Sequence, residues 1–169
     1  MHENKGDVEG FSTPEYISKL PGFEPTTDGF KLPGFEVHVG DDLRILYKDS
    51  VGVDHYEYWD KNIEFKGNKV YQRDDLIDPS RVNPQNGLTS IENMKIGNSA
   101  TGPDGKPIHI HHLIQTQDGA LAEITQTFHQ KNTKIIHIFD KKVPTNIDRK
   151  EFNQWKNQYW KERSKQFEK

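Results

Sequence analysis

The stretch Ile108-His109-Ile110-His111-His112-Leu113 carries most of what this sequence says about its fold and its chemistry. It holds three of the chain's eight histidines within four residues. Neutral imidazole binds divalent metals and takes up protons near neutral pH. The cluster therefore predicts a site that holds a metal ion and supplies a base, the two parts that a hydrolytic site needs.

The residues around this cluster predict a β-hairpin followed by a short helix. Residues 109–116 read as one strand and residues 120–124 as the return strand, joined through the turn signal Asp118-Gly119. Thr125 is a suitable helix N-cap, so the residues after it are expected to form a helix that carries His129.

Adjacent histidines point to opposite faces of a regular strand. His111 and His112 therefore share one site only at a strand end, a bulge or a strong twist, or when they have different tasks. Phosphodiester hydrolysis needs an activated water and stabilisation of the phosphorane and the leaving 3′ oxygen. The opposite directions of the two side chains suit a metal ligand that faces the ion and a base that faces the water. His109 shares the strand face of His111 and is a further candidate.

The first 34 residues contain an internal repeat. Leu-Pro-Gly-Phe-Glu occurs at residues 20–24 and again at residues 32–36. Pro-Gly marks turns, and two copies are too few for a solenoid. We interpret residues 1–34 as a connector with short docking elements; the alternative is that the Phe side chains pack on the domain that follows.

Beyond the repeat the pattern becomes strand-like. Apolar residues alternate with polar ones over residues 35–39 and 43–47, and residues 63–71 read as a hairpin with Gly67-Asn68 in the turn. Residues 35–78 are therefore expected to form a small β region.

The C-terminal part predicts a helix. Residues 79–107 are rich in Pro, Gly, Asn and Ser and should be mainly loop. Asp148 and Glu151 then have capping-box spacing, and aromatic residues recur after them at helical intervals. We expect an amphipathic, basic helix over residues 149–167, whose aromatic stripe packs into the core rather than against bases. The stripe is Phe152, Trp155 and Tyr159.

Composition limits the class of protein. The 169 residues suit one domain, or a small domain with an attached segment. There is no Cys, so disulfides and thiolate metal sites are excluded and a metal must use His, Asp, Glu or Asn. No apolar run approaches the roughly 20 residues that span a bilayer. The N-terminus shows no signal segment, so any export signal is expected outside this chain.

Charge is distributed unevenly along a chain whose net charge is −3. Residues 1–30 carry six acids and two bases, a net charge of −4, whereas residues 128–169 carry eleven bases and five acids, a net charge of +6. A basic C-terminal third beside a histidine cluster fits a polyanionic substrate. On charge alone, a solvated helical face explains these bases equally well.

Four segments between residues 90 and 140 match one known pattern. They are Met94-Lys95-Ile96-Gly97-Asn98, Gly102-Pro103-Asp104-Gly105-Lys106-Pro107, Ile110-His111-His112, and Gln117-Asp118-Gly119-Ala120-Leu121-Ala122-Glu123-Ile124-Thr125 followed by His129 and His137. Their order and spacing resemble the LHH family of predicted nucleases in the HNH/endonuclease VII superfamily, with Ile110 where the family name expects Leu. The resemblance implies an α+β fold with a ββα-metal (treble-clef-like) core at about residues 90–140, between the N-terminal β region and the C-terminal helix.

The resemblance also implies roles for the histidines. His111 resembles the first metal ligand, His112 the general base and His137 the last metal ligand. The third position of an HNH motif orients the base or joins the metal shell. His129 matches it best, with Asn132 as the alternative. One divalent ion, Mg²⁺, Mn²⁺, Ni²⁺ or Zn²⁺, is expected.

Other residues near the motif are assigned supporting roles. Glu123 on the return strand is expected to orient an imidazole by hydrogen bonding. Four lysines that flank the site in sequence are candidate phosphate contacts: Lys95, Lys106, Lys131 and Lys134. The three histidines outside the motif are expected to be structural: His2, His38 and His55.

Domains of this family are typically C-terminal warheads of bacterial polymorphic toxins, including the LXG type. The resemblance implies that residues 35–169 are a toxin nuclease domain, secreted as part of a longer protein and delivered into the cytoplasm of a target bacterium. It also implies a cognate immunity protein, and residues 1–34 as the tether. DNA is the expected substrate because the superfamily mostly cuts DNA. The alternatives are a ribonuclease with the same site, or a non-catalytic binding module stabilised by a metal.

Overall fold

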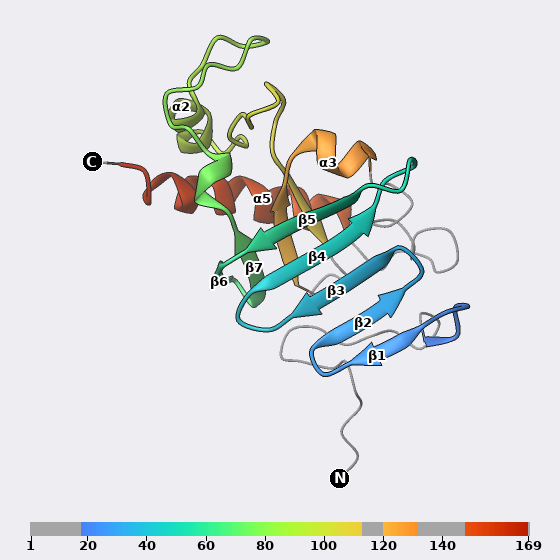
Figure 1. Ribbon diagram of the computed structural model, residues 1–169. Helices are drawn as coiled ribbons and strands as arrows, with labels where there is room; N and C mark the ends of the chain where they lie inside the picture. The colour runs from blue at the N-terminus through green and yellow to red at the C-terminus, as the bar shows by residue number, and fades with distance from the viewer. Residues whose placement is uncertain (1–17, 113–119, 132–147, 169) are drawn as a thin grey trace. The chain divides into compact units, whose positions relative to one another are not determined.

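The computed structural model describes residues 18–112, 120–131 and 148–168 (Figure 1). The fold is α+β, as predicted, with two sheets and a C-terminal helix. The described residues fall into two units. The first runs to Gln72 and includes Ala120, and the second contains the remaining residues from Arg73 onwards. No helix in the described ranges is long and apolar enough to cross a membrane.

The first unit contains a five-stranded antiparallel sheet whose strands follow one another in chain order. The strands are β1 (Glu24–Thr26), β2 (Gly29–Leu32), β3 (Phe35–Val39), β4 (Leu43–Lys48) and β5 (Asp54–Trp59). The alternation predicted for β3 and β4 is confirmed, because one set of their side chains is buried. The buried set includes Val37, Val39, Leu43 and Ile45.

Both copies of the repeat belong to this sheet. Each Pro-Gly forms a turn with glycine at positive φ, 81° at Gly22 and 77° at Gly34, and the turn leads into β1 or β3. The rings of Phe23 and Phe35 each lie 6.0 Å from that of Phe30, which is 2% exposed. The sheet therefore begins inside the segment expected to be a connector, and residue 34 is not a boundary between folded parts. A tethering role for residues 1–34 stays a prediction.

The two histidines of the first unit, His38 and His55, form hydrogen bonds with carboxylates. His38 Nδ1 lies 2.6 Å from Asp28 and its Nε2 lies 3.1 Å from Glu36. His55 Nε2 lies 2.8 Å from Asp49. These contacts support the structural role predicted for both histidines.

The predicted hairpin at residues 63–71 is present as β6 (Lys61–Phe65) and β7 (Asn68–Gln72). Its turn lies one residue earlier than expected. Lys66 and Gly67 both have positive φ, 48° and 85°, as a two-residue turn of type I′ requires. Asn68 instead opens β7 opposite Phe65.

The second unit begins with a short 3₁₀ helix, η1 (Asp74–Leu76), and a helix that the loop prediction missed. That helix is α2 (Ser90–Lys95), in the segment expected to be mainly loop. Thr89 and Glu92 form a reciprocal capping box, which satisfies backbone N–H groups at the start of the helix.

Around the histidine cluster the predicted pair of antiparallel strands and the predicted helix are present (Figure 1). Residues 113–116 of the predicted first strand and the predicted turn Asp118-Gly119 lie outside the described ranges. Strands β8 (His109–His112) and β9 (Leu121–Ile124) are antiparallel, with His109 opposite Ile124. Helix α3 (Gln126–Lys131) follows at once, and Thr125 Oγ1 accepts the N–H of Phe128 as its N-cap. The residues between β8 and Ala120 lie outside the described ranges.

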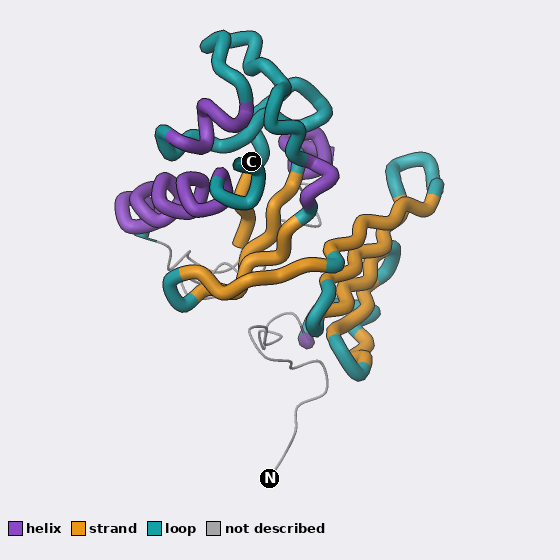
Figure 2. Tube along the Cα trace, turned by 90° about the vertical axis from the view of Figure 1, so that its left-hand side faces the viewer, coloured by secondary structure: helices purple, strands orange, loops and turns teal. Residues whose placement is uncertain are grey.

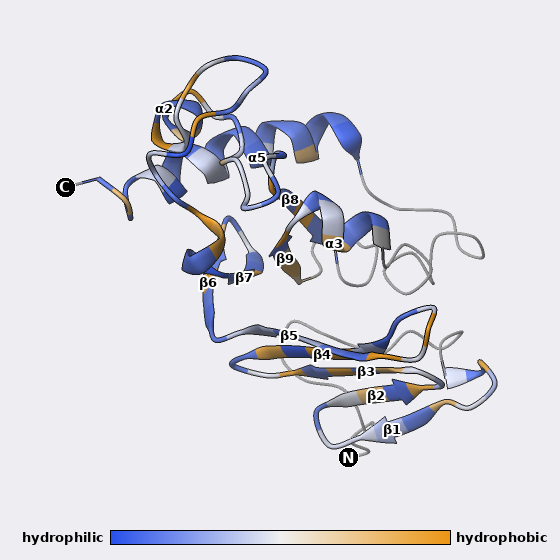
Figure 3. Cartoon of the chain, turned by 45° about the horizontal axis from the view of Figure 1, so that its top comes forward, coloured by the Kyte–Doolittle hydropathy of each residue, from blue (hydrophilic) through white to orange (hydrophobic). Residues whose placement is uncertain are grey.

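The C-terminal helix is α5 (Arg149–Ser164), the longest described helix (Figure 2). Asp148 caps it by accepting the N–H of Glu151. The predicted aromatic stripe is buried, as expected for core packing: Phe152, Trp155 and Tyr159, together with Trp160. The rest of the helix is mainly hydrophilic (Figure 3).

Candidate active site

Strand β8 divides its four side chains between two faces. Ile110 and His112 are 7% and 3% exposed, whereas His109 and His111 are half-buried. The division follows from the two-residue period of a strand. His111 and His112 therefore point apart, as the sequence predicted for a ligand and a base.

Three imidazoles meet on one of these faces. The His129 ring on α3 lies 5.3 Å from the His109 ring and 5.3 Å from the His111 ring, measured between centroids. Helix α3 reaches β8 because it starts directly after β9, the partner of β8 in the hairpin. We call His109, His111 and His129 the histidine face. It brings together two of the predicted site residues and adds His109.

Burial favours the neutral form of two of these imidazoles. It lowers the pKa of His109, and the charges of His129 and Lys156 lower that pKa further, against the opposing effect of Asp104. Burial also lowers the pKa of His129. Neutral imidazole is the form that binds metal, so the environment suits metal ligation at neutral pH.

The Gly102–Pro107 loop fixes the start of α3. Asp104 Oδ2 accepts the backbone N–H of Thr127 at 3.0 Å and its hydroxyl at 2.8 Å. Burial tends to raise the pKa of Asp104, but these hydrogen bonds and one from the Lys106 N–H outweigh it and lower the pKa. The turn was predictable from Pro-Asp-Gly, but its contact with a helix 23 residues away was not.

The opposite face of β8 packs against α5. The His112 ring lies 4.4 Å from the Phe152 ring, and Lys156 Nζ lies 4.8 Å from the centroid of that same ring. Lys156, which sequence reasoning missed, thus lies close to the histidine cluster. Helical periodicity places it one turn after Phe152, but no local signal shows that α5 packs on β8.

Glu123 also belongs to the α5 face. Its carboxylate accepts bonds from Nε and Nη2 of Arg163, both at 2.9 Å, from the Tyr159 hydroxyl at 2.7 Å and from the Arg73 N–H at 3.0 Å. Arg163 also donates to Asp74 at 2.8 Å. These contacts join β9 to α5 and to the start of the second unit. The orienting role toward an imidazole stays a prediction.

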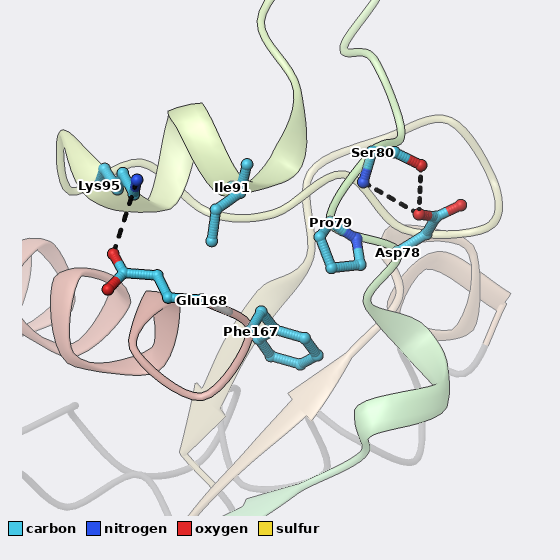
Figure 4. Close-up of a pocket in the computed structure, with 7 residues that line it drawn as sticks. All are labelled: Asp78, Pro79, Ser80, Ile91, Lys95, Phe167 and Glu168. Carbon is cyan, nitrogen blue, oxygen red and sulfur yellow. Dashed lines mark hydrogen bonds and ion pairs between the residues drawn. The ribbon is translucent and has the colours of Figure 1, made fainter.

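The predicted phosphate contacts differ in their surroundings. Lys95 lies 3.7 Å from Glu168 at a surface hollow between α2 and the end of α5 (Figure 4). Lys106 is exposed beside Asp104. Four residues that the sequence analysis assigned to the site lie in whole or in part outside the described structure: the side chain of Lys131, and Asn132, Lys134 and His137.

The histidine face fits a divalent ion in donor type and in spacing. Two imidazoles that share an ion at about 2.1 Å place their ring centres about 5 Å apart, close to the separations found here. Among the residues that the structure describes, however, no three His, Asp or Glu side chains are arranged to hold an ion as they lie. The face therefore brings together side chains of a type that ligates metals, but the described residues alone do not form a metal site.

Comparison with known proteins gives one finding. Residues 89–166 match the model of the LHH family, described as a nuclease of the HNH/ENDO VII superfamily with conserved LHH. The matched segment contains α2, β8, β9, α3 and α5, and so includes the strand and the helix that carry the histidine face. No solved structure matches the chain.

Proposed function

Residues 89–166 belong to the LHH family of nucleases in the HNH/ENDO VII superfamily, and from this we propose that the protein is a metal-dependent endonuclease that hydrolyses DNA. The observation that carries the proposal is the meeting of His111 and His129, from two elements of the matched segment, on one face of β8. In this proposal β8, β9 and α3 are the ββα-metal core.

The residues take different tasks in the reaction. His111 and His129 would hold the ion together with His137, and His112 on the other face would accept a proton from the attacking water. A bound Mg²⁺, Mn²⁺, Ni²⁺ or Zn²⁺ ion supplies neutralisation of charge on the phosphorane and on the leaving oxygen. Asp104 positions His129 through Thr127.

The burial of His112 favours a second assignment within the same function. His112 is 3% exposed, whereas His129 is half-buried, so His129 has the easier access to water. In that case His129 is the base and His112 packs β8 onto α5. Retained metal binding in His129→Ala with lost cleavage would select the second assignment.

The proposal is tested with purified protein, supercoiled plasmid and total RNA, each with the four metals and with chelator. Wild type should cut plasmid with metal, and His111→Ala should be at least about a hundredfold slower. His55→Ala, in the first unit, is the matched control and should keep its activity. Equal cleavage by wild type and His111→Ala would overturn the proposal.

The same experiment separates the alternatives. Cleavage of RNA but not of plasmid would select a ribonuclease with this site. A binding module stabilised by metal would cut neither and would unfold on chelation, whereas a nuclease with its own packed core should stay folded.

We further propose that the nuclease acts as a polymorphic toxin of the LXG type. In this role it is secreted within a longer protein, enters the cytoplasm of a target bacterium and is neutralised by a cognate immunity protein. The family's typical context supports this role. Cytoplasmic expression of wild type should stop bacterial growth, and expression of His111→Ala should not. Normal growth with active wild-type nuclease would contradict the toxin role.

A further inference from the structure

We propose that Lys156 of α5 binds a phosphate group of the nucleic acid at the histidine cluster. The inference rests on the proposed nuclease function and adds a substrate contact to it. Lys156 is not among the lysines that the sequence singled out, which were chosen because they flank the histidines along the chain.

Position is the first argument. Lys156 Nζ lies 4.8 Å from the centre of the Phe152 ring, and that ring lies 4.4 Å from the His112 ring. The Lys156 ammonium group therefore lies one aromatic ring away from His112 of the cluster.

The lack of a counter-charge is the second argument. Within the described ranges no carboxylate pairs with Lys156, whereas Lys95 pairs with Glu168 and Lys165 with Glu162. Lys156 is half-buried, and burial together with the charge of Arg149 lowers its pKa. A partly buried cation without a counter-charge is unfavourable unless an anion joins it. A bound anion would remove this cost.

Chemistry identifies the anion as phosphate. The ammonium of Lys is a compact point charge that binds phosphate oxygens without reading a base. The Lys156 ammonium group lies over the Phe152 ring, and this contact holds the charge near His112. A phosphodiester bound there would neutralise Lys156 and would lie close to the histidine cluster.

The test compares Lys156→Met, which keeps the apolar stem and removes the charge, with Lys156→Arg and with Lys161→Met. Lys161 is exposed on another side of the same helix. Two quantities are measured: binding of a DNA duplex in chelator over a range of salt, and cleavage with metal. Lys156→Met should weaken binding and cleavage about ten- to a hundredfold and reduce the salt slope by about one. Lys156→Arg should restore part of both, and Lys161→Met should stay within about twofold of wild type.

Each other outcome overturns the inference. If wild type cuts and Lys156→Met matches it in cleavage, binding and salt slope, the inference fails and the nuclease proposal stands. Equal losses in Lys156→Met and Lys161→Met mean that helix charge in general, not Lys156, is responsible. If wild type cuts neither DNA nor RNA, the nuclease proposal fails and the inference fails with it. Near-UV circular dichroism checks the packing of Trp155, and Lys156→Gln replaces Lys156→Met if that packing changes.

Discussion

The two faces of β8 differ in the polar groups that they bring together. Toward α5, opposite charges are paired within the chain, since Glu123 and Arg163 are both almost fully buried and hydrogen-bonded to each other. On the histidine face, three imidazoles meet, and burial lowers the pKa of two of them, His109 and His129. Complementary pairs stabilise a fold by themselves, whereas like ligands gain most from an ion placed between them. The difference predicts which substitutions affect activity and which affect stability.

The largest expected effect separates the adjacent histidines. His111→Ala and His112→Ala should both slow plasmid cleavage by at least about a hundredfold, because a ligand and a base are both essential. Only His111→Ala should weaken metal binding, measured by calorimetry, because His112 faces α5. Equal loss of metal affinity in both variants would show that the two faces are not distinct in solution.

The next effect concerns stability. Arg163→Met leaves the Glu123 carboxylate buried without its guanidinium, and should lower the free energy of unfolding by about 3–5 kcal/mol in urea titrations. Lys165→Met is the control, since its pair with Glu162 is exposed and should contribute no more than about 1 kcal/mol. Similar losses in the two variants would mean that the Glu123 network does not hold the α5 face together.

A smaller effect is expected where the loop supports the histidine face. Asp104→Ala removes both hydrogen bonds to Thr127, so the start of α3 and the position of His129 become less fixed. Stability should fall by about 1 kcal/mol and cleavage by about tenfold. Asp78→Ala is a close control, because Asp78 bonds the N–H and hydroxyl of Ser80 in the same way. Unchanged cleavage in Asp104→Ala would remove Asp104 from the site.

The smallest effect lies away from both faces. Thr89→Ala breaks the capping box of α2 and should lower the free energy of unfolding by about 1 kcal/mol. The folded variant should cleave plasmid at the wild-type rate. A large fall in cleavage, measured where the variant is fully folded, would show that α2 takes part in the reaction.

Local patterns in the sequence were sufficient to predict several of the strands and helices. The alternation in β3 and β4, the N-cap Thr125 and the cap Asp148 are signals within a few residues, and the structure confirms each. The capping box of α2 at Thr89 and Glu92 is an equally local signal, but the loop prediction rested on the Pro, Gly, Asn and Ser content of residues 79–107 and did not use it.

Contacts between distant residues could not be predicted in this way. Glu123 and Arg163 are 40 positions apart, and nothing near either residue identifies its partner. The same holds for Lys156 and the histidine cluster. The repeat was misleading for another reason: Pro-Gly turns serve a connector and a sheet equally well, and only the pairing of β2 with β3 decides between them.

The central claim is that His111 and His129 hold one ion together. Calorimetric titration of Mn²⁺ or Ni²⁺ into wild type, His111→Ala, His129→Ala and the double variant tests it directly. If both imidazoles bind the same ion, the second substitution should cost much less affinity than the first, so the two effects should not add. Full additivity, or unchanged affinity in either single variant, would contradict the claim.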